Sequence, residues 1–151
     1  MTFPPPPPLS PSARRLGLSG LVPQAIACFT ALIDPELKWI ALAAGFGYAA
    51  FIFSFLGGLW WGIALTCQNA PRWLYGVAVT PSLIALALYL PWTIGWSWPN
   101  PSLVILAVCL AGSLIIDTKV AEVVDLPDGW LSLRKVLSFG LAALTGLLTV
   151  A

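Results

Sequence analysis

The feature that most constrains this chain is a run without a charged residue from Trp39 to Leu65. As a helix the run would be roughly 40 Å long, which exceeds the roughly 30 Å hydrocarbon core of a bilayer. Composition agrees, because charged residues make up 9% of the chain, against about 25% in soluble domains. The run therefore predicts a membrane-spanning helix.

Five apolar segments follow a proline-rich start, and we expect each to cross the membrane. Their predicted bounds are 16–33, 39–65, 73–92, 102–116 and 136–151. The first, fourth and fifth are short, so interfacial residues would complete their spans. Residues 1–13 contain six prolines, Pro4 to Pro8 and Pro11, and predict a disordered polyproline arm. The predicted fold class is all-α, a single bundle of five transmembrane helices in residues 14–151.

The cations predict how this bundle is oriented. With five spans, one side of the membrane receives Arg14, Arg15, Arg72, Lys119, Arg134 and Lys135, and the other receives only Lys38. Because Lys and Arg are enriched on the cytoplasmic side, we expect a cytoplasmic N-terminus and an external C-terminus. The segment from Ala25 to Cys28 loosely resembles a lipoprotein cleavage box. A retained first helix is the interpretation we favour, since Pro23 and Gln24 interrupt the apolar region that a signal would need.

A row of small residues marks one face of the second span. Ala50, Ser54, Gly58 and Gly62 recur every four residues, a spacing that lets membrane helices approach closely. We predict a helix-packing face of Ser54, Gly58, Trp61 and Gly62 that points inward, with Trp60 on the opposite side toward lipid or another helix. The alternative is a flat floor for a planar ligand beside Trp61.

Two prolines, Pro23 and Pro81, interrupt the first and third spans at a similar depth. Each frees a backbone carbonyl that a polar neighbour can satisfy. We hypothesise a weakly polar layer around a mid-membrane cavity, lined by Gln24, Ser82, Gly58 and Thr145. The alternative is that these side chains only satisfy their own backbones.

Charged side chains gather at the predicted cytoplasmic ends of the spans. Asp117 follows the fourth span, and a pair with Arg134 or Arg72 would latch the third, fourth and fifth spans together. Anchoring to lipid headgroups is the alternative. No Asp, Glu, Lys, Arg or His occupies the middle of any predicted span, which argues against proton-coupled transport.

Catalysis and metal binding find little support in the sequence. The chain has no histidine, and its three cysteines show neither metal spacing nor a disulfide framework. No Ser or Cys lies at a motif spacing from a base. A net charge of +1 provides no broad basic face for nucleic acid. We therefore expect a protein that is not an enzyme, with no metal, no cofactor and no nucleic-acid partner.

Several motifs resemble one family of membrane proteins. These are the run from Phe55 to Gly62, Pro81-Ser82-Leu83, Asp117, and the stretch from Leu126 to Arg134. They are similar to uncharacterised small membrane proteins related to transmembrane protein 69, which share a domain of unknown function. The resemblance implies a five-helix, multi-pass protein of the bacterial inner membrane, or of an equivalent mitochondrial membrane, and it implies no activity. Tryptophan-rich five-helix translocator proteins that bind porphyrins and sterols are similar in architecture alone.

Taken together, the sequence predicts a non-catalytic membrane protein that contacts the lipid bilayer. The first hypothesis is a small subunit or assembly partner that packs against other membrane proteins, or against itself, through the glycine face. The alternative hypothesis is a binder or carrier of an apolar small molecule, such as a lipid, a quinone or a porphyrin, in a mid-membrane cavity.

Overall fold

The computed structural model describes residues 8–67, 69–96 and 98–151, and these form a helical bundle. The helices are α1 (Pro11–Ser19), α2 (Val22–Ile33), α3 (Lys38–Thr66), α4 (Arg72–Thr93), α5 (Asn100–Val123) and α6 (Trp130–Leu147), with a final 3-10 turn η1 (Leu148–Val150). Five stretches of the described residues are long and apolar enough to cross a membrane, with α1 and α2 together forming the first. The predicted fold class is confirmed for this part of the chain.

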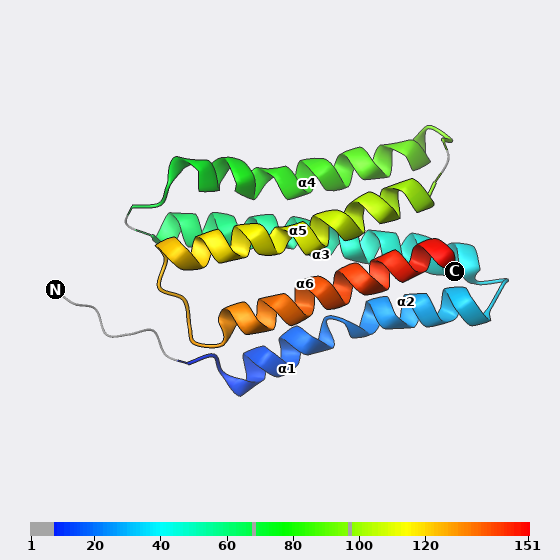
Figure 1. Cartoon of the computed structure of the whole chain (residues 1–151). Helices are drawn as coiled ribbons and strands as arrows, with labels where there is room; N and C mark the ends of the chain where they lie inside the picture. Colours follow the sequence, from blue (N-terminus) through cyan, green and yellow to red (C-terminus); the bar gives the residue numbers. More distant parts are fainter. Residues whose placement is uncertain (1–7, 68, 97) are drawn as a thin grey trace.

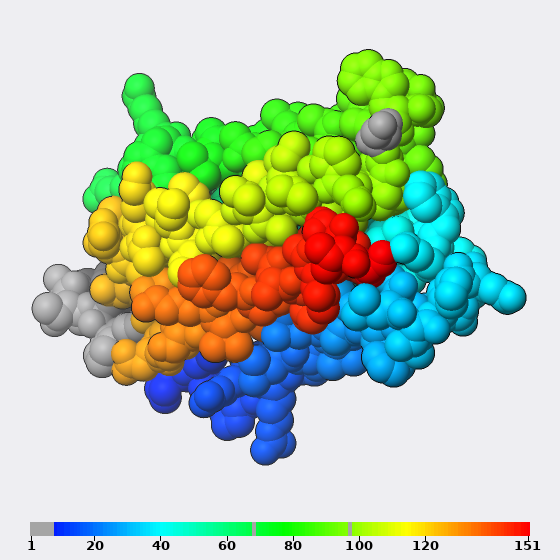
Figure 2. All heavy atoms as spheres, turned by 45° about the vertical axis from the view of Figure 1, so that its right-hand side comes forward, coloured from blue at the N-terminus to red at the C-terminus, as the bar shows by residue number. Residues whose placement is uncertain are grey.

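Successive spans run in opposite directions along the bundle (Figure 1). Helix α3 occupies the centre, where it packs against α2 on one side and α4 on the other. Helix α6 lies between α5 and the α1–α2 pair, and Figure 2 shows it closing the space between them. Half of the most apolar part of α3 is buried, a larger share than in any other described span. The long uncharged run is therefore the core helix of the bundle.

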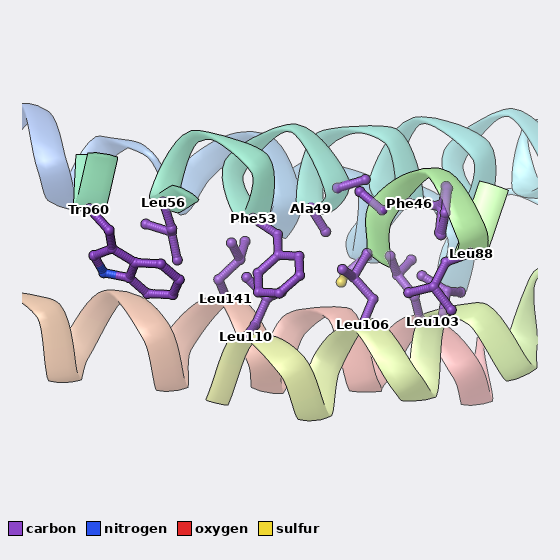
Figure 3. Packing of buried hydrophobic residues seen from close by; sticks show 14 of the residues in the cluster. Phe46, Ala49, Phe53, Leu56, Trp60, Leu88, Leu103, Leu106, Leu110 and Leu141 are labelled. Atoms are coloured by element: carbon purple, nitrogen blue, oxygen red, sulfur yellow. The ribbon is translucent and has the colours of Figure 1, made fainter. Parts of the chain in front are cut away.

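Large side chains fill the space between α3 and its neighbours. Figure 3 shows Phe53 and Trp60 pointing from α3 toward α5 and α6, with Phe53 beside Leu110 and Leu141. Outward residues such as Phe51, 75% exposed, would contact lipid tails. Because lipid is as apolar as these side chains, close packing rather than hydrophobicity distinguishes the interior.

The inward face of α3 differs from the predicted one. Trp60 is 2% exposed, whereas Trp61 is 42% exposed, and Gly58 and Gly62 are exposed as well. A Cβ built on Gly58 meets no atom of the described residues within 4 Å, but a Cβ on Gly57 would collide with the backbone of α4 at Ala78. The expectation of an inward face is therefore wrong for Gly58, Trp61 and Gly62, whereas Ser54 is half-buried between α3 and α4. One residue turns a helix by about 100°, and in an apolar helix residue type does not mark the buried side.

The prolines act as predicted in one helix and differently in the other. Pro81 stays inside α4, and the Thr80 hydroxyl donates to the carbonyl of Val77 (2.8 Å), which proline leaves without a backbone partner. In the first span the break falls at Gly20 and Leu21, so Pro23 lies in the first turn of α2, where proline is tolerated.

Two of the predicted spans are shorter than the corresponding helices. Helix α5 continues past Ile116 to Val123, and α6 begins at Trp130, six residues before the predicted start of the last span. Gly129, with φ of 84°, directly precedes α6. Residues 1–7 of the predicted arm lie outside the described residues, while its last three form the first turn of α1, where the Ser10 hydroxyl accepts from the Ala13 N–H (3.1 Å). Charged and polar residues thus extend the helices toward the membrane surface.

Candidate functional site

A buried ion pair lies where α3, α5 and α6 meet. Asp117 of α5 is 0% exposed, and each of its carboxylate oxygens accepts one hydrogen bond. The indole Nε1–H of Trp60 donates to Oδ1 (2.8 Å), and the Nε–H of Arg134 donates to Oδ2 (2.8 Å). Three helices are therefore joined at one carboxylate.

Two serines extend this arrangement along α5 and α6. Arg134 donates from Nη2 to the hydroxyl of Ser138 (3.4 Å), and the hydroxyls of Ser138 and Ser113 lie 3.3 Å apart. Ser113 and Asp117 are four residues apart on α5, as Arg134 and Ser138 are on α6, so each helix presents its pair on one face. We call Trp60, Ser113, Asp117, Arg134 and Ser138 the Asp117 network.

The network is held away from the ends of its helices. Asp117 lies six residues before the end of α5, and Arg134 lies four residues after the start of α6, which places them about 9 and 6 Å inside. Isolated charges at such positions would be costly in a bilayer. The opposite charges and the indole N–H offset that cost, so the network has no net charge.

A cavity of about 230 Å³ adjoins the network and is named here the Arg134 cavity. Its walls come from α1 and the α1–α2 turn, from α3, and from α5 and α6. Arg134 and Ser138 are its polar lining residues, and the others are Leu, Ile, Phe or Gly. Tyr48 of α3 donates to the carbonyl of Gly20, which fixes the turn that covers the cavity. The guanidinium has five N–H donors, and its described hydrogen bonds use two of its three nitrogens.

A second hollow lies between α3 and α4. This groove of about 370 Å³ has a floor of small residues that includes Ser54 and Ser82, and its walls include Tyr89 and Trp92. It contains no charged lining residue. The groove is therefore lined by three residues with hydroxyl groups, Ser54, Ser82 and Tyr89, and by no charged residue.

The predicted mid-membrane polar layer does not form as one site. Gln24 and Thr145 are both fully buried, and the amide Nε2–H of Gln24 donates to the Thr145 hydroxyl (3.1 Å). Ser82 instead lines the α3–α4 groove, and Gly58 faces outward. The helices bring only two of the four residues together, because the depth of a residue along its helix does not determine the direction it faces.

The predicted latch forms in part. Asp117 and Arg134 pair as hypothesised, whereas Arg72 is exposed at the start of α4, outside the described network. Trp60 is a member of the network that was not predicted, since the sequence placed it opposite the packing face without a polar role. Asp117 lies inside α5 and is buried, and a buried carboxylate requires hydrogen-bond donors. An indole N–H on a neighbouring helix is one such donor, and this requirement is the signal that could have identified Trp60.

Metal-binding groups do not gather in the described residues, where no three His, Cys, Asp or Glu side chains come close enough to hold an ion. Cys28 is buried, with Sγ 3.0 Å from the carbonyl of Leu144. The chemistry of this part of the chain therefore rests on hydrogen bonding and one ion pair.

Comparison with known proteins gives a family and no activity. No curated protein and no solved structure matches the chain. A family model described as "Protein of unknown function (DUF3429)" matches residues 9–150, a range that includes every helix described above. The chain therefore belongs to the DUF3429 family.

Proposed function

We propose that this protein is a non-catalytic integral membrane protein that binds an amphipathic small molecule in the Arg134 cavity. The observation that carries the proposal is the guanidinium of Arg134, which lies with Ser138 in the wall of a mainly apolar cavity within the five-helix bundle. Apolar pockets with a few placed polar groups are the usual form of small-molecule sites. The apolar walls would hold the body of the ligand, and Arg134 would hold its polar end.

The Asp117 network supports this proposal because it orients the guanidinium. Asp117 holds Arg134 by Nε, and Ser138 lies beside Nη2, so the side chain is fixed before a ligand arrives. A binding group fixed in advance loses little conformational freedom on binding, which favours affinity.

The same geometry supports a non-catalytic role. Both carboxylate oxygens of Asp117 already accept hydrogen bonds, and the residue is fully buried, so it is poorly placed to take a proton from a substrate. The sequence has no histidine to act in its place.

The test is to fill the Arg134 cavity with a larger side chain and to measure whether the bound ligand is lost. We expect protein extracted in a mild detergent to carry a small molecule in native mass spectra, and Ile52→Trp to remove it, because Ile52 lines the cavity. The matched control is Ile105→Trp, since Ile105 is 48% exposed on α5. Equal ligand content in both variants would contradict the proposal.

A second candidate function is that of a small subunit or assembly partner. It is favoured by the outward glycines of α3, Gly58 and Gly62, because a Cβ at either one meets nothing within 4 Å among the described residues. Another membrane protein, or a second copy of the chain, would pack there. We expect Gly58→Leu to abolish co-purification of such a partner, whereas Gly112→Leu on α5, also in open space, would not.

We further propose a location in the bacterial inner membrane, with the N-terminus in the cytoplasm. The bundle supports this orientation because its alternating helices gather the cations of α1, α4, α5 and α6 at one end, opposite Lys38. In a cysteine-free variant, we expect an impermeant thiol reagent to label Lys38→Cys from outside and not Asp128→Cys. The reverse pattern would invert the topology.

A further inference from the structure

We infer, on the basis of the proposed function, that the ligand of the Arg134 cavity is a neutral ring that bears carbonyl oxygens and an apolar chain, as a quinone does. Three observations lead to this class: the donors in the cavity wall, the charge of the network, and the volume of the cavity.

The cavity wall presents hydrogen-bond donors. A guanidinium donates and cannot accept, so the group that meets Arg134 has to be an acceptor. Ser138 lies on the same wall, but its hydroxyl accepts from Nη2 of Arg134 and donates to Ser113, whose own hydroxyl donates to the carbonyl of Leu110. Arg134 therefore supplies the donors for a ligand. A carbonyl oxygen can accept from the N–H groups of Arg134 that Asp117 and Ser138 do not use, whereas an ammonium offers them no acceptor.

The charge of the network favours a neutral acceptor over an anionic one. Asp117 already balances Arg134, so a carboxylate or phosphate would bring an uncompensated charge into a site surrounded by apolar residues. The cations of α1, Arg14 and Arg15, are exposed and do not line the cavity. A neutral carbonyl gains the hydrogen bond without that cost.

The volume limits the size of the ligand. A cavity of about 150 Å³ in another protein holds one benzene ring, and the Arg134 cavity measures about 230 Å³. One substituted ring therefore fits, while a four-ring porphyrin or sterol does not. Leu16 and Phe55 line the cavity and are 72% and 67% exposed, so its rim faces lipid, and a chain attached to the ring can extend into the bilayer.

The experiment compares three probes of similar length on the detergent-solubilised full chain. They are a benzoquinone with a ten-carbon chain, decylbenzene, which lacks the acceptor, and dodecanoate, which is anionic. We expect the quinone to bind about tenfold or more tightly than decylbenzene, as one hydrogen bond from a charged donor would give. Ile52→Trp should abolish quinone binding and Ile105→Trp should preserve it, with both variants checked for a native thermal transition. If Ile52→Trp does not fold, Leu137→Phe fills the same cavity.

The outcomes separate this inference from the proposed function. Tighter binding of dodecanoate than of the quinone, lost on filling the cavity, would overturn the neutral carbonyl and leave the proposed function standing. Equal binding of decylbenzene and the quinone would overturn the role of Arg134 in recognition. Binding of no probe, or binding that filling the cavity does not change, would overturn both proposals.

Discussion

Two buried polar clusters join the helices of this bundle, and they are built differently. The Asp117 network connects α3, α5 and α6 through charged groups, and both oxygens of its carboxylate have a donor. The Gln24 pair, Gln24 with Thr145, connects α2 to α6 through neutral groups. In this pair the amide Oε1 of Gln24 is buried and has no partner among the described residues.

The difference reflects what each kind of group costs when it is buried. An unpaired charge in an apolar interior is strongly destabilising, so Asp117 is found only with complementary donors. A neutral amide oxygen without a partner costs less, and the fold tolerates one. Helix α6 contributes to both clusters, at Arg134 and Thr145, which lie roughly 16 Å apart along its axis. It is therefore fixed at two depths, by interactions of unequal strength.

The largest effect is expected at the charged cluster. Asp117→Ala leaves Arg134 as an uncompensated charge, and we expect the free energy of unfolding in detergent micelles to fall by about 3–5 kcal/mol. The double variant Asp117→Leu with Arg134→Met removes both charges and should recover much of that loss. A double variant no more stable than the single one would mean that charge balance is not what stabilises this site.

A smaller loss is expected when only the indole donor is removed. Trp60→Phe keeps an aromatic ring and takes one hydrogen bond from Asp117, so we expect a loss of about 1–3 kcal/mol in the same assay. Trp61→Phe is the matched control, since Trp61 is far more exposed and should change stability by less than about 0.5 kcal/mol. Equal losses in the two variants would remove Trp60 from the network.

The neutral cluster should respond less. Thr145→Val keeps the shape of the side chain and removes the acceptor of the Gln24 amide, so we expect a loss of about 1 kcal/mol. Thr149→Val, one turn further along at a partly exposed position, controls for the loss of a hydroxyl. A loss as large as that of Asp117→Ala would erase the distinction between the clusters.

The smallest effect is expected at Gln24 itself. Gln24→Met preserves the length of the side chain and removes the unpartnered oxygen together with the bonded amide, so stability should stay within about 1 kcal/mol of the original. Gln24→Ala leaves a void and should be the worse of the two. If Gln24→Met is the more destabilising variant, the amide has a partner that the described contacts do not include.

The sequence predicts the fold of this chain better than it predicts the site. The length and the mean hydropathy of each apolar segment determine how many helices can cross a bilayer, and both follow directly from the sequence. The side of α3 that faces its neighbours depends on packing, and large apolar residues lie all around that helix, so Gly58 was assigned in place of Gly57. The pairing of Asp117 with Arg134 was foreseeable because few charges lie near the spans. The contact with Trp60 depends on the rotation of α3, which hydropathy does not encode.

The Asp117 network also has a consequence for the biosynthesis of the chain. Its carboxylate is synthesised with α5, before α6 has supplied Arg134, so a nascent chain that ends after α5 holds a buried acid without its cation. Gly17 of α1 likewise lies near Leu133 and Leu137 of α6, so α1 also lacks part of its packing until α6 has been synthesised. Insertion of the α5–α6 hairpin as a unit would pair the charges while they enter the bilayer. Helix α6 therefore completes the packing of both α5 and α1.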